Sequence, residues 1–402
     1  MVLDQAATML VVCSAAAVLP GLSRVLCIPS PVVEIFFGVL LGKSLFNLEP
    51  AGEWLPFLAE LGFLILMLHA GMEIDFRALS RQRPRRLLVH LLVFAVTAGM
   101  ALGCSLLMGH GVFMALVLST TSLGLVLPGL KDAGLGRGAF AQTILIAATL
   151  ADFLTLLGIT VYNLWFSHGL TWRLLLPLPI FTGFGVLFYL GRLWAWWHPR
   201  IAERLLMSDD PSEQGVRFSM ALLFLLVGIS ELAGLEPVLG AFMGGCVLAF
   251  VFREKQVLEQ KLSALGFGFL IPIFFIHVGM QFDVRNVLGL DHLLFSGLLL
   301  TMALAVKLLP SLLYTLAGLE AGMSLRAGLL LSSRLSLIVA AASIGLAQGF
   351  ITPALKDAIV LLALLTALLG PTLFKLSMRG LAPPPTAQPK PPRPPRADLE
   401  GT

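Results

Sequence analysis

The chain has 402 residues, of which 57% are hydrophobic and 12% charged, and its mean hydropathy is +0.92. This composition excludes an ordinary soluble globular protein and favours a chain embedded in a bilayer. The formal net charge of +4 does not indicate a nucleic-acid partner, because the basic residues are spread through short loops rather than gathered in one domain.

Apolar runs of membrane-spanning length follow one another from residue 4 to residue 378. About 20 apolar residues cross the hydrocarbon core as a helix, and lipid offers the backbone no hydrogen-bond partners, so each run is expected to be helical. The thirteen predicted spans are 4–22, 31–47, 55–75, 87–108, 111–130, 138–165, 172–191, 215–234, 237–252, 264–282, 292–316, 322–346 and 353–378. The pattern predicts an all-α polytopic membrane protein with 13 transmembrane helices.

The distribution of basic residues predicts how the chain is oriented. With the N-terminus outside, 21 of the 27 Lys and Arg residues fall on the inner face and four on the outer face, as the positive-inside rule requires. The start carries Asp4, no cleavage site and no organellar presequence, so we expect a retained first helix and a bacterial inner membrane. The tail, 379–402, is basic and proline-rich, which predicts a disordered cytoplasmic segment.

The four cysteines stand in or beside apolar runs at irregular spacing. They are Cys13, Cys27, Cys104 and Cys246. This spacing indicates neither a disulfide framework nor a metal centre, and no cofactor is expected.

Two segments far apart in the chain resemble each other. The third span ends HAGMEIDFR at residues 69–77, and the tenth ends HVGMQFDVR at residues 277–285. A similar offset relates 31–38 to 237–244. The matched spans are seven places apart in the order of helices, so they run in opposite directions. The sequence therefore predicts two inverted six-helix repeats linked by a seventh helix, an arrangement typical of alternating-access carriers, although duplication without transport remains an alternative.

The fifth and twelfth spans contain breaks at matching positions. The fifth carries Thr120, Thr121 and Ser122 ahead of Pro128, and the twelfth carries Ser333, Arg334 and Ser336. Crossed discontinuous helices at mid-depth would expose carbonyl and hydroxyl oxygens to a cation. A proline kink and Ser/Thr hydrogen bonds to the preceding turn are the alternative explanations.

Asp152 lies at the middle of its span, about 20 Å from either end at about 1.5 Å per residue. A carboxylate at the bilayer centre is unfavourable unless it faces a cavity or a partner. Such a group can bind a proton or a small cation, but binding of one disfavours the other. This competition is the minimum that exchange of a cation for a proton requires. A structural salt bridge with Lys307, also mid-span, is the alternative.

Other charged residues in spans are assigned supporting roles. Arg334 is expected to neutralise the carbonyl ends of the broken helices, since guanidinium keeps its charge. His69 and His277 lie near span ends and are expected to pack through hydrogen bonds. Glu34, Glu60 and Glu231 lie closer to span ends, where packing or an access path is expected.

Taken together, these motifs resemble the monovalent cation:proton antiporter-2 family, which includes Kef-type and Nap-type antiporters. The similar segments are 60–75, 120–122, 151–152, 274–283, Lys307 and 328–338, within a resemblance that covers nearly all of 4–378. The resemblance implies exchange of Na⁺ or K⁺ for H⁺, with both competing for Asp152, and an elevator-like motion for pH homeostasis. It also implies a homodimer with a dimerisation part, 4–47 and 172–252, and a core part, 55–165 and 264–378.

Two positions depart from the family pattern. Many relatives have an acidic or amide residue where this chain has Ala151, and a glutamate where it has Ser336. A site with one carboxylate favours electroneutral, one-for-one exchange.

Three other functions remain open. A sodium-coupled organic anion symporter of related fold could use Lys307 and Arg334 as its anion anchor, and a membrane sensor could have kept the fold without transport. An intramembrane aspartyl protease would need two facing aspartates deep within spans, and the sequence offers one at mid-span, Asp152, so no enzyme is expected.

Overall fold

The computed structural model describes residues 2–26, 28–46, 49–50, 52–74, 76, 84–135, 138–169, 213–251, 256–285 and 289–378, with a few positions between 182 and 197. Some features predicted from the sequence lie wholly or largely outside these residues. They are the seventh predicted span, the tail, Cys27, Asp75 and several of the inner-face arginines.

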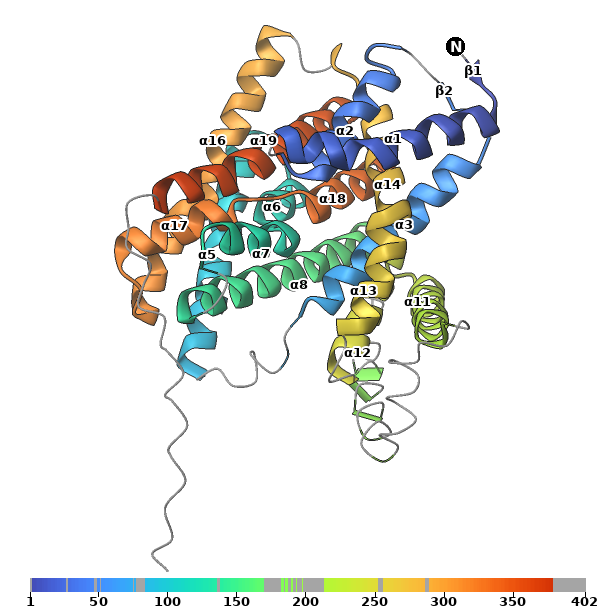
Figure 1. Ribbon diagram of the computed structural model, residues 1–402. Helices are drawn as coiled ribbons and strands as arrows, with labels where there is room; N and C mark the ends of the chain where they lie inside the picture. The colour runs from blue at the N-terminus through green and yellow to red at the C-terminus, as the bar shows by residue number, and fades with distance from the viewer. Residues whose placement is uncertain are drawn as a thin grey trace, which may run out of the picture.

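The described chain is a bundle of helices (Figure 1). In chain order they are α1 (Gln5–Leu26), α2 (Ser30–Leu41), α3 (Trp54–Met72), α5 (Pro84–Leu107), α6 (Val112–Ser119), α7 (Leu123–Asp132), α8 (Ala139–His168), α11 (Gln214–Leu232), α12 (Pro237–Val251), α13 (Gln256–Leu265), the π-helical turn η2 (Gly266–Leu270), α14 (Ile271–Met280), α16 (Leu290–Ser311), the 3-10 turn η3 (Leu312–Ala317), α17 (Ala321–Leu331), α18 (Ser336–Ala347) and α19 (Pro353–Met378). A two-residue parallel pair, β1 (Val2–Leu3) with β2 (Glu49–Pro50), was not expected from the sequence.

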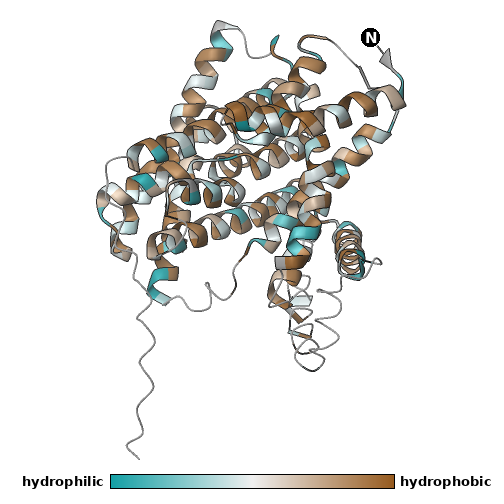
Figure 2. Cartoon of the chain, viewed as in Figure 1, coloured by the Kyte–Doolittle hydropathy of each residue, from teal (hydrophilic) through white to brown (hydrophobic). Residues whose placement is uncertain are grey.

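The helices have the length and apolarity of membrane spans. Among the described residues, nine helices are long enough and apolar enough to cross a bilayer, the bent pair α17 and α18 would make a tenth, and α2 and α12 are shorter apolar helices. Hydrophobic residues occur along most of the helices (Figure 2), and many large apolar side chains are exposed as well as buried. The all-helical prediction is confirmed, while the total of thirteen stays a prediction.

Prolines mark where several helices begin. α5, α12 and α19 start at Pro84, Pro237 and Pro353, and α2 has Pro31 in its first turn. Proline suits this position because its fixed φ angle is helical and its missing N–H would have no intrahelical partner there.

The predicted breaks in the fifth and twelfth spans are confirmed. α6 ends at Ser119 and α7 begins at Leu123, so residues 120–122 interrupt the fifth span. α17 ends at Leu331 and α18 begins at Ser336, with a bend of 48° between them. Both breaks are buried among α5, α8, α16 and α19.

The helices form two groups by packing. The panel helices are α1, α2, α3 and α11 to α14, in which α3 packs most extensively on α12, and α14 on α2. The bundle helices are α5 to α8 and α16 to α19, which contain both breaks. The two groups are recognisable on the right and left of Figure 1, and they meet where α8 passes α12.

Glycines in the panel helices reveal the internal repeat. A Cβ atom at Gly38 would collide with the carbonyl of Ile276 and approach Gly279, and one at Gly245 would collide with the carbonyl of Leu68 and approach Gly71. The contacts of Gly71 with Phe242 and of Gly279 with Ile35 correspond in the same way. The α2–α14 pair and the α3–α12 pair are therefore equivalent, with offsets of 207 or 208 residues, and helix backbones touch at both.

Candidate functional site

The break between α6 and α7 forms the centre of the site. Thr120 and Thr121 are fully buried and Ser122 is 2% exposed. Ser122 adopts an extended conformation, with φ −139° and ψ 106°, so the chain leaves one helix before entering the next. Two opposite helix ends therefore face the same small region, the carbonyl end of α6 and the N–H end of α7.

Asp152 lies at the N–H end of α7. Its Oδ2 atom accepts a hydrogen bond from the Leu123 N–H at 3.2 Å, and the backbone of Thr121 also interacts with it. The partial positive charge of a helix N-terminus stabilises a carboxylate at this position. The Oδ1 atom is buried and has no hydrogen-bond partner among the described residues. One carboxylate oxygen is thus held by the protein, and the other is available to a ligand.

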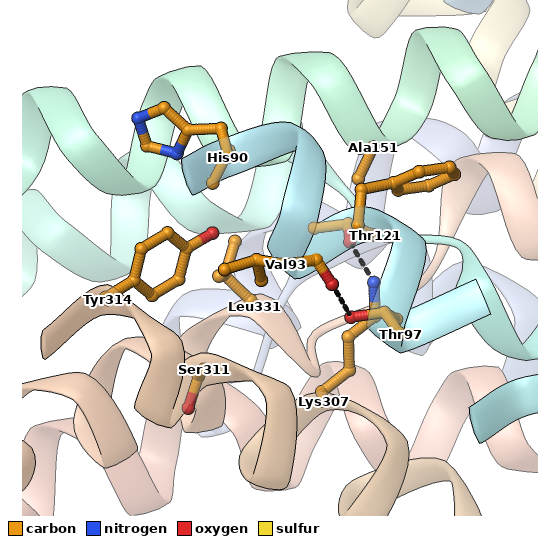
Figure 3. A pocket seen from close by; sticks show the side chains of 11 residues that line it. His90, Val93, Thr97, Thr121, Ala151, Lys307, Ser311, Tyr314 and Leu331 are labelled. Atoms are coloured by element: carbon orange, nitrogen blue, oxygen red, sulfur yellow. Dashed lines mark hydrogen bonds between the residues drawn. The ribbon is translucent and has the colours of Figure 1, made fainter. Parts of the chain in front are cut away.

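Lys307 lies at the carbonyl end of α6. Its Nζ atom donates to the Ser119 carbonyl at 2.7 Å and to Thr121 Oγ1 at 2.7 Å, the second of which is drawn in Figure 3. Asp152 and Lys307 interact electrostatically, but they are not within ion-pair distance of each other. The direct salt bridge considered from the sequence is therefore absent between these two described side chains, and each charge is instead matched to a helix end.

The second break contributes Ser336 and Arg334. The hydroxyls of Ser122 and Ser336 are 3.4 Å apart, so the two breaks meet. Arg334 is fully buried and donates from Nη2 to the Ala303 carbonyl of α16 at 2.8 Å. The carbonyl that Arg334 binds therefore belongs to a continuous helix, whereas a carbonyl end of a broken helix was expected from the sequence.

The remaining candidates divide into those near the breaks and those away from them. Ser333 is buried beside Gly370, and its hydroxyl has no partner among the described residues. Ala151 lines a small cavity that also contains Lys307. Glu60 is exposed on α3 and is not brought to the breaks. The structure thus gathers Asp152, the 120–122 segment, Lys307 and Ser336 around one position and leaves Glu60 apart.

Three comparisons with known proteins bear on the family and fold of this chain. Residues 11–378 match the family model described as sodium/hydrogen exchanger, transmembrane. The chain belongs to this family. It is 32% identical over 370 residues to the putative Na(+)/H(+) antiporter YjbQ of Bacillus subtilis, covering 87% of this chain and 59% of that protein.

Two further exchangers are similar over most of their length. The probable Na(+)/H(+) antiporter 3 of Methanocaldococcus jannaschii is 25% identical, with 89% of this chain and 92% of that protein covered. The solved sodium proton antiporter MjNhaP1 from the same organism has a TM-score of 0.66 at 13% identity, covering 92% of this chain and 97% of that one, and shares its fold. These findings support the broad class of cation:proton antiporters, and not the narrower Kef-type or Nap-type branch that the motifs indicated.

The exchanger structure adds residues that the sequence interpretation missed. Glu73 caps the end of α3 and interacts electrostatically with Asp152. Thr155, one turn beyond Asp152 on α8, is fully buried and its hydroxyl has no partner among the described residues. The only sequence signal for Glu73 is its place in the repeat, where the second copy has Gln281.

Proposed function

We propose that this chain exchanges a monovalent cation, Na⁺ or K⁺, for H⁺ by alternating access, with the cation and the proton competing for Asp152. The observation that carries the proposal is the state of the Asp152 carboxylate. It is 9% exposed, its Oδ2 atom is held at the α7 N-terminus, and its Oδ1 atom has no partner among the described residues.

The surrounding oxygen atoms suit a small alkali cation. Hard cations prefer carboxylate, carbonyl and hydroxyl oxygens. Thr120, Thr121, Ser122 and Ser336 provide such atoms at the two breaks, the first of which also holds Asp152. When a proton occupies Asp152, the negative charge that attracts a cation is lost, so the two ligands exclude each other. No bond of a substrate is made or broken in this cycle, and we propose a transporter rather than an enzyme.

The position of Lys307 supports electroneutral, one-for-one exchange. Its ammonium group is bound to α6 and to Thr121 rather than paired directly with Asp152. A cation that binds Asp152 therefore does not have to displace a lysine charge from the carboxylate. We propose that Lys307 keeps its charge through the cycle and that only Asp152 exchanges its ligand.

The moving part is proposed to be the bundle helices. Both breaks, Asp152, Lys307 and Arg334 belong to this group, and its contacts with the panel helices are sparse. The backbone contact at Gly38–Gly279 joins α14 to α2, and the contact at Gly71–Gly245 joins α3 to α12, so α3 and α14 both belong to the panel helices. This division differs from the one implied by the family resemblance, which assigned 55–165 and 264–378 together to the core. In an elevator motion, the bundle helices would slide along the panel helices.

The proposal extends to the membrane and to a second copy. The excess of basic residues on one face supports an outer N-terminus, a cytoplasmic C-terminus and a bacterial inner membrane. The panel helices α1 and α11 expose large apolar side chains, including Val25 and Leu232, and we propose that the panel helices meet those of a second copy within the lipid. Chemical cross-linking in native membranes, compared with the same protein diluted in detergent, tests the dimer.

Purified protein in proteoliposomes provides the main test of function. Vesicles with an acidic interior are exposed to Na⁺, K⁺ or Li⁺ in separate experiments, and internal pH is followed with the membrane potential clamped. We expect cation-dependent alkalinisation that does not change with the potential. A potential-dependent rate would contradict electroneutral exchange, and no cation-dependent proton flux would contradict the proposed function.

A further inference from the structure

A small cavity lies beside the proposed cation site, next to Lys307. Its volume is about 20 Å³, and it is bounded by α5, α8, α16, α17 and η3. Its polar lining consists of His90, Thr97, Thr121, Lys307, Ser311 and Tyr314 (Figure 3). Asp152 does not line it, although its neighbour Ala151 does.

The groups around this cavity leave hydrogen bonds unmade. His90 is 3% exposed, and its Nδ1 atom has no partner among the described residues. A buried polar atom without a partner is destabilising by about 1–3 kcal/mol. Lys307 uses two of its three donors, on Ser119 and Thr121, which leaves one for another acceptor. Ser311 donates to the Leu308 carbonyl and keeps its lone pairs.

The size and polarity of the cavity suit a water molecule. A water needs roughly 10–15 Å³ of such space and two to four polar partners. The cavity volume of about 20 Å³ and its six polar side chains meet both requirements. His90 Nδ1 and the remaining donor of Lys307 are the unsatisfied groups that line the cavity and that water there could bond.

We propose that this cavity holds a water through which protons pass between the cation site and His90, on a branch separate from the route of the cation. This inference rests on the proposed function. Thr121 joins the site to the cavity, because its backbone interacts with Asp152 and its side chain lines the cavity. The proton leaves Asp152, which stays ionised, and reaches the cavity water beside Thr121; the water passes a proton to His90 Nδ1 while another proton leaves His90 from Nε2.

The surroundings of His90 fit a relay rather than a permanent charge. Arg86 lies one turn before His90 on α5. The ring centroids of His90 and of Tyr314 in η3 are 5.6 Å apart. Lys307 of α16 lines the same cavity. α8 faces the cavity with Ala147 and Ala151, and α6 carries no titratable residue. Because His90 is buried and lies near the positive charge of Arg86, a doubly protonated His90 is disfavoured, and each arriving proton is passed on. Lys307 stays charged and orients the water.

The test compares two kinds of exchange in proteoliposomes of the full chain. Na⁺/H⁺ exchange requires proton movement, whereas isotopic Na⁺/Na⁺ exchange at equal pH requires only the cation route. For His90→Gln, which can bind water but cannot relay a proton, we expect at least about a tenfold loss of Na⁺/H⁺ exchange, since proton transfer by a positioned group contributes about 10²–10⁴-fold. Na⁺/Na⁺ exchange and stabilisation by Na⁺ should stay within about twofold of wild type.

Two further variants keep the result decisive. His110→Gln changes a histidine in the turn beyond the other end of α5, which does not line the cavity, and should leave both activities unchanged. Ala147→Val fills the cavity without altering His90, and should reduce Na⁺/H⁺ exchange selectively even if His90→Gln does not fold. Equal losses in both kinds of exchange, or no loss in either, would overturn the proposal. Failure of the proposed function would instead appear in the wild-type protein.

Discussion

The ends of α3 and α14 have the same backbone packing and different polar chemistry. At the end of α3, Gly71 touches the backbone of α12, and at the end of α14, Gly279 touches that of α2. Two residues further on, the first copy has Glu73, which interacts electrostatically with Asp152. The second has Gln281, which hydrogen-bonds to Lys356 at 3.2 Å and to His277 at 2.8 Å.

This difference indicates what duplication preserves. Contacts between helix backbones leave no room for a side chain, so both copies keep glycine at the same places. The polar positions beside them are not constrained in this way and can diverge. As a result, negative charge gathers near Asp152 in one half, while the corresponding end of the other half is a neutral amide beside a lysine.

The largest effect is expected where the two halves differ most in charge. Asp152 on α8 and Asp357 on α19 are both buried carboxylates, but only Asp152 lies at a helix break. Asp152→Asn should reduce cation-dependent proton flux to that of empty liposomes, because the amide cannot exchange a proton for a cation. Asp357→Asn, compared per amount of folded protein, should retain exchange. Exchange that survives Asp152→Asn would refute the assignment of this site.

The packing contacts should respond equally in the two halves. Gly71→Ala and Gly279→Ala each place a methyl group against backbone, and overpacking of this kind destabilises by about 1–3 kcal/mol. Thermal unfolding in detergent should show a similar decrease in Tm for both variants. Gly103→Ala, on α5 with nothing within 4 Å of the added Cβ, should cause no loss. A decrease in Tm for only one of the two variants would argue against the equivalence of the α2–α14 and α3–α12 pairs.

The sequence predicted features that depend on local pattern. Apolar length, hydroxyl-rich breaks and a mid-span carboxylate are visible along the chain, so both discontinuities and the candidacy of Asp152 could be stated in advance. Contacts between distant segments could not. Glu73 lies beyond the end of α3, and only folding brings it near Asp152, while His90 resembles an ordinary packing histidine until α16 and η3 close a cavity around it. The repeat identifies corresponding helices, but not which helices pack together.

Exchanging the two polar residues tests the comparison directly. Glu73→Gln makes the end of α3 resemble that of α14 and removes a negative charge near the site. We expect the apparent affinity for Na⁺ in the transport assay to fall roughly fivefold, as a change of about 1 kcal/mol in attraction would give. The reverse change, Gln281→Glu, should leave this affinity unchanged, because Gln281 contacts Lys356 rather than Asp152. An equal change in the apparent affinity for Na⁺ in both variants would show that the effect of Glu73 does not come from its closeness to Asp152.

The smallest effect is expected at the starts of α2 and α12, which also correspond in the repeat. Ser30 donates to Glu34 within α2, whereas Glu236, just before α12, accepts hydrogen bonds from Asn163 at 2.6 Å and Gln348 at 3.5 Å. Burial raises the pKa of Glu236 above its usual 4.5, so the folded state binds this proton more tightly than the unfolded state does. Its contribution to stability is therefore largest below the usual pKa and declines as pH rises through the raised value.

Glu236→Gln removes that titration while keeping an oxygen for Asn163. The Tm difference between the variant and wild type, measured in detergent from pH 4 to pH 8, should shift in favour of the variant as pH rises. Glu231→Gln removes a charge from the exposed end of α11 and serves as the matched control. If the Glu236→Gln difference is independent of pH, hydrogen bonds from the two amides cancel the effect of burial; if it moves in the opposite direction, they outweigh burial. In that case the start of α12 differs from the start of α2 in holding a stabilised charge.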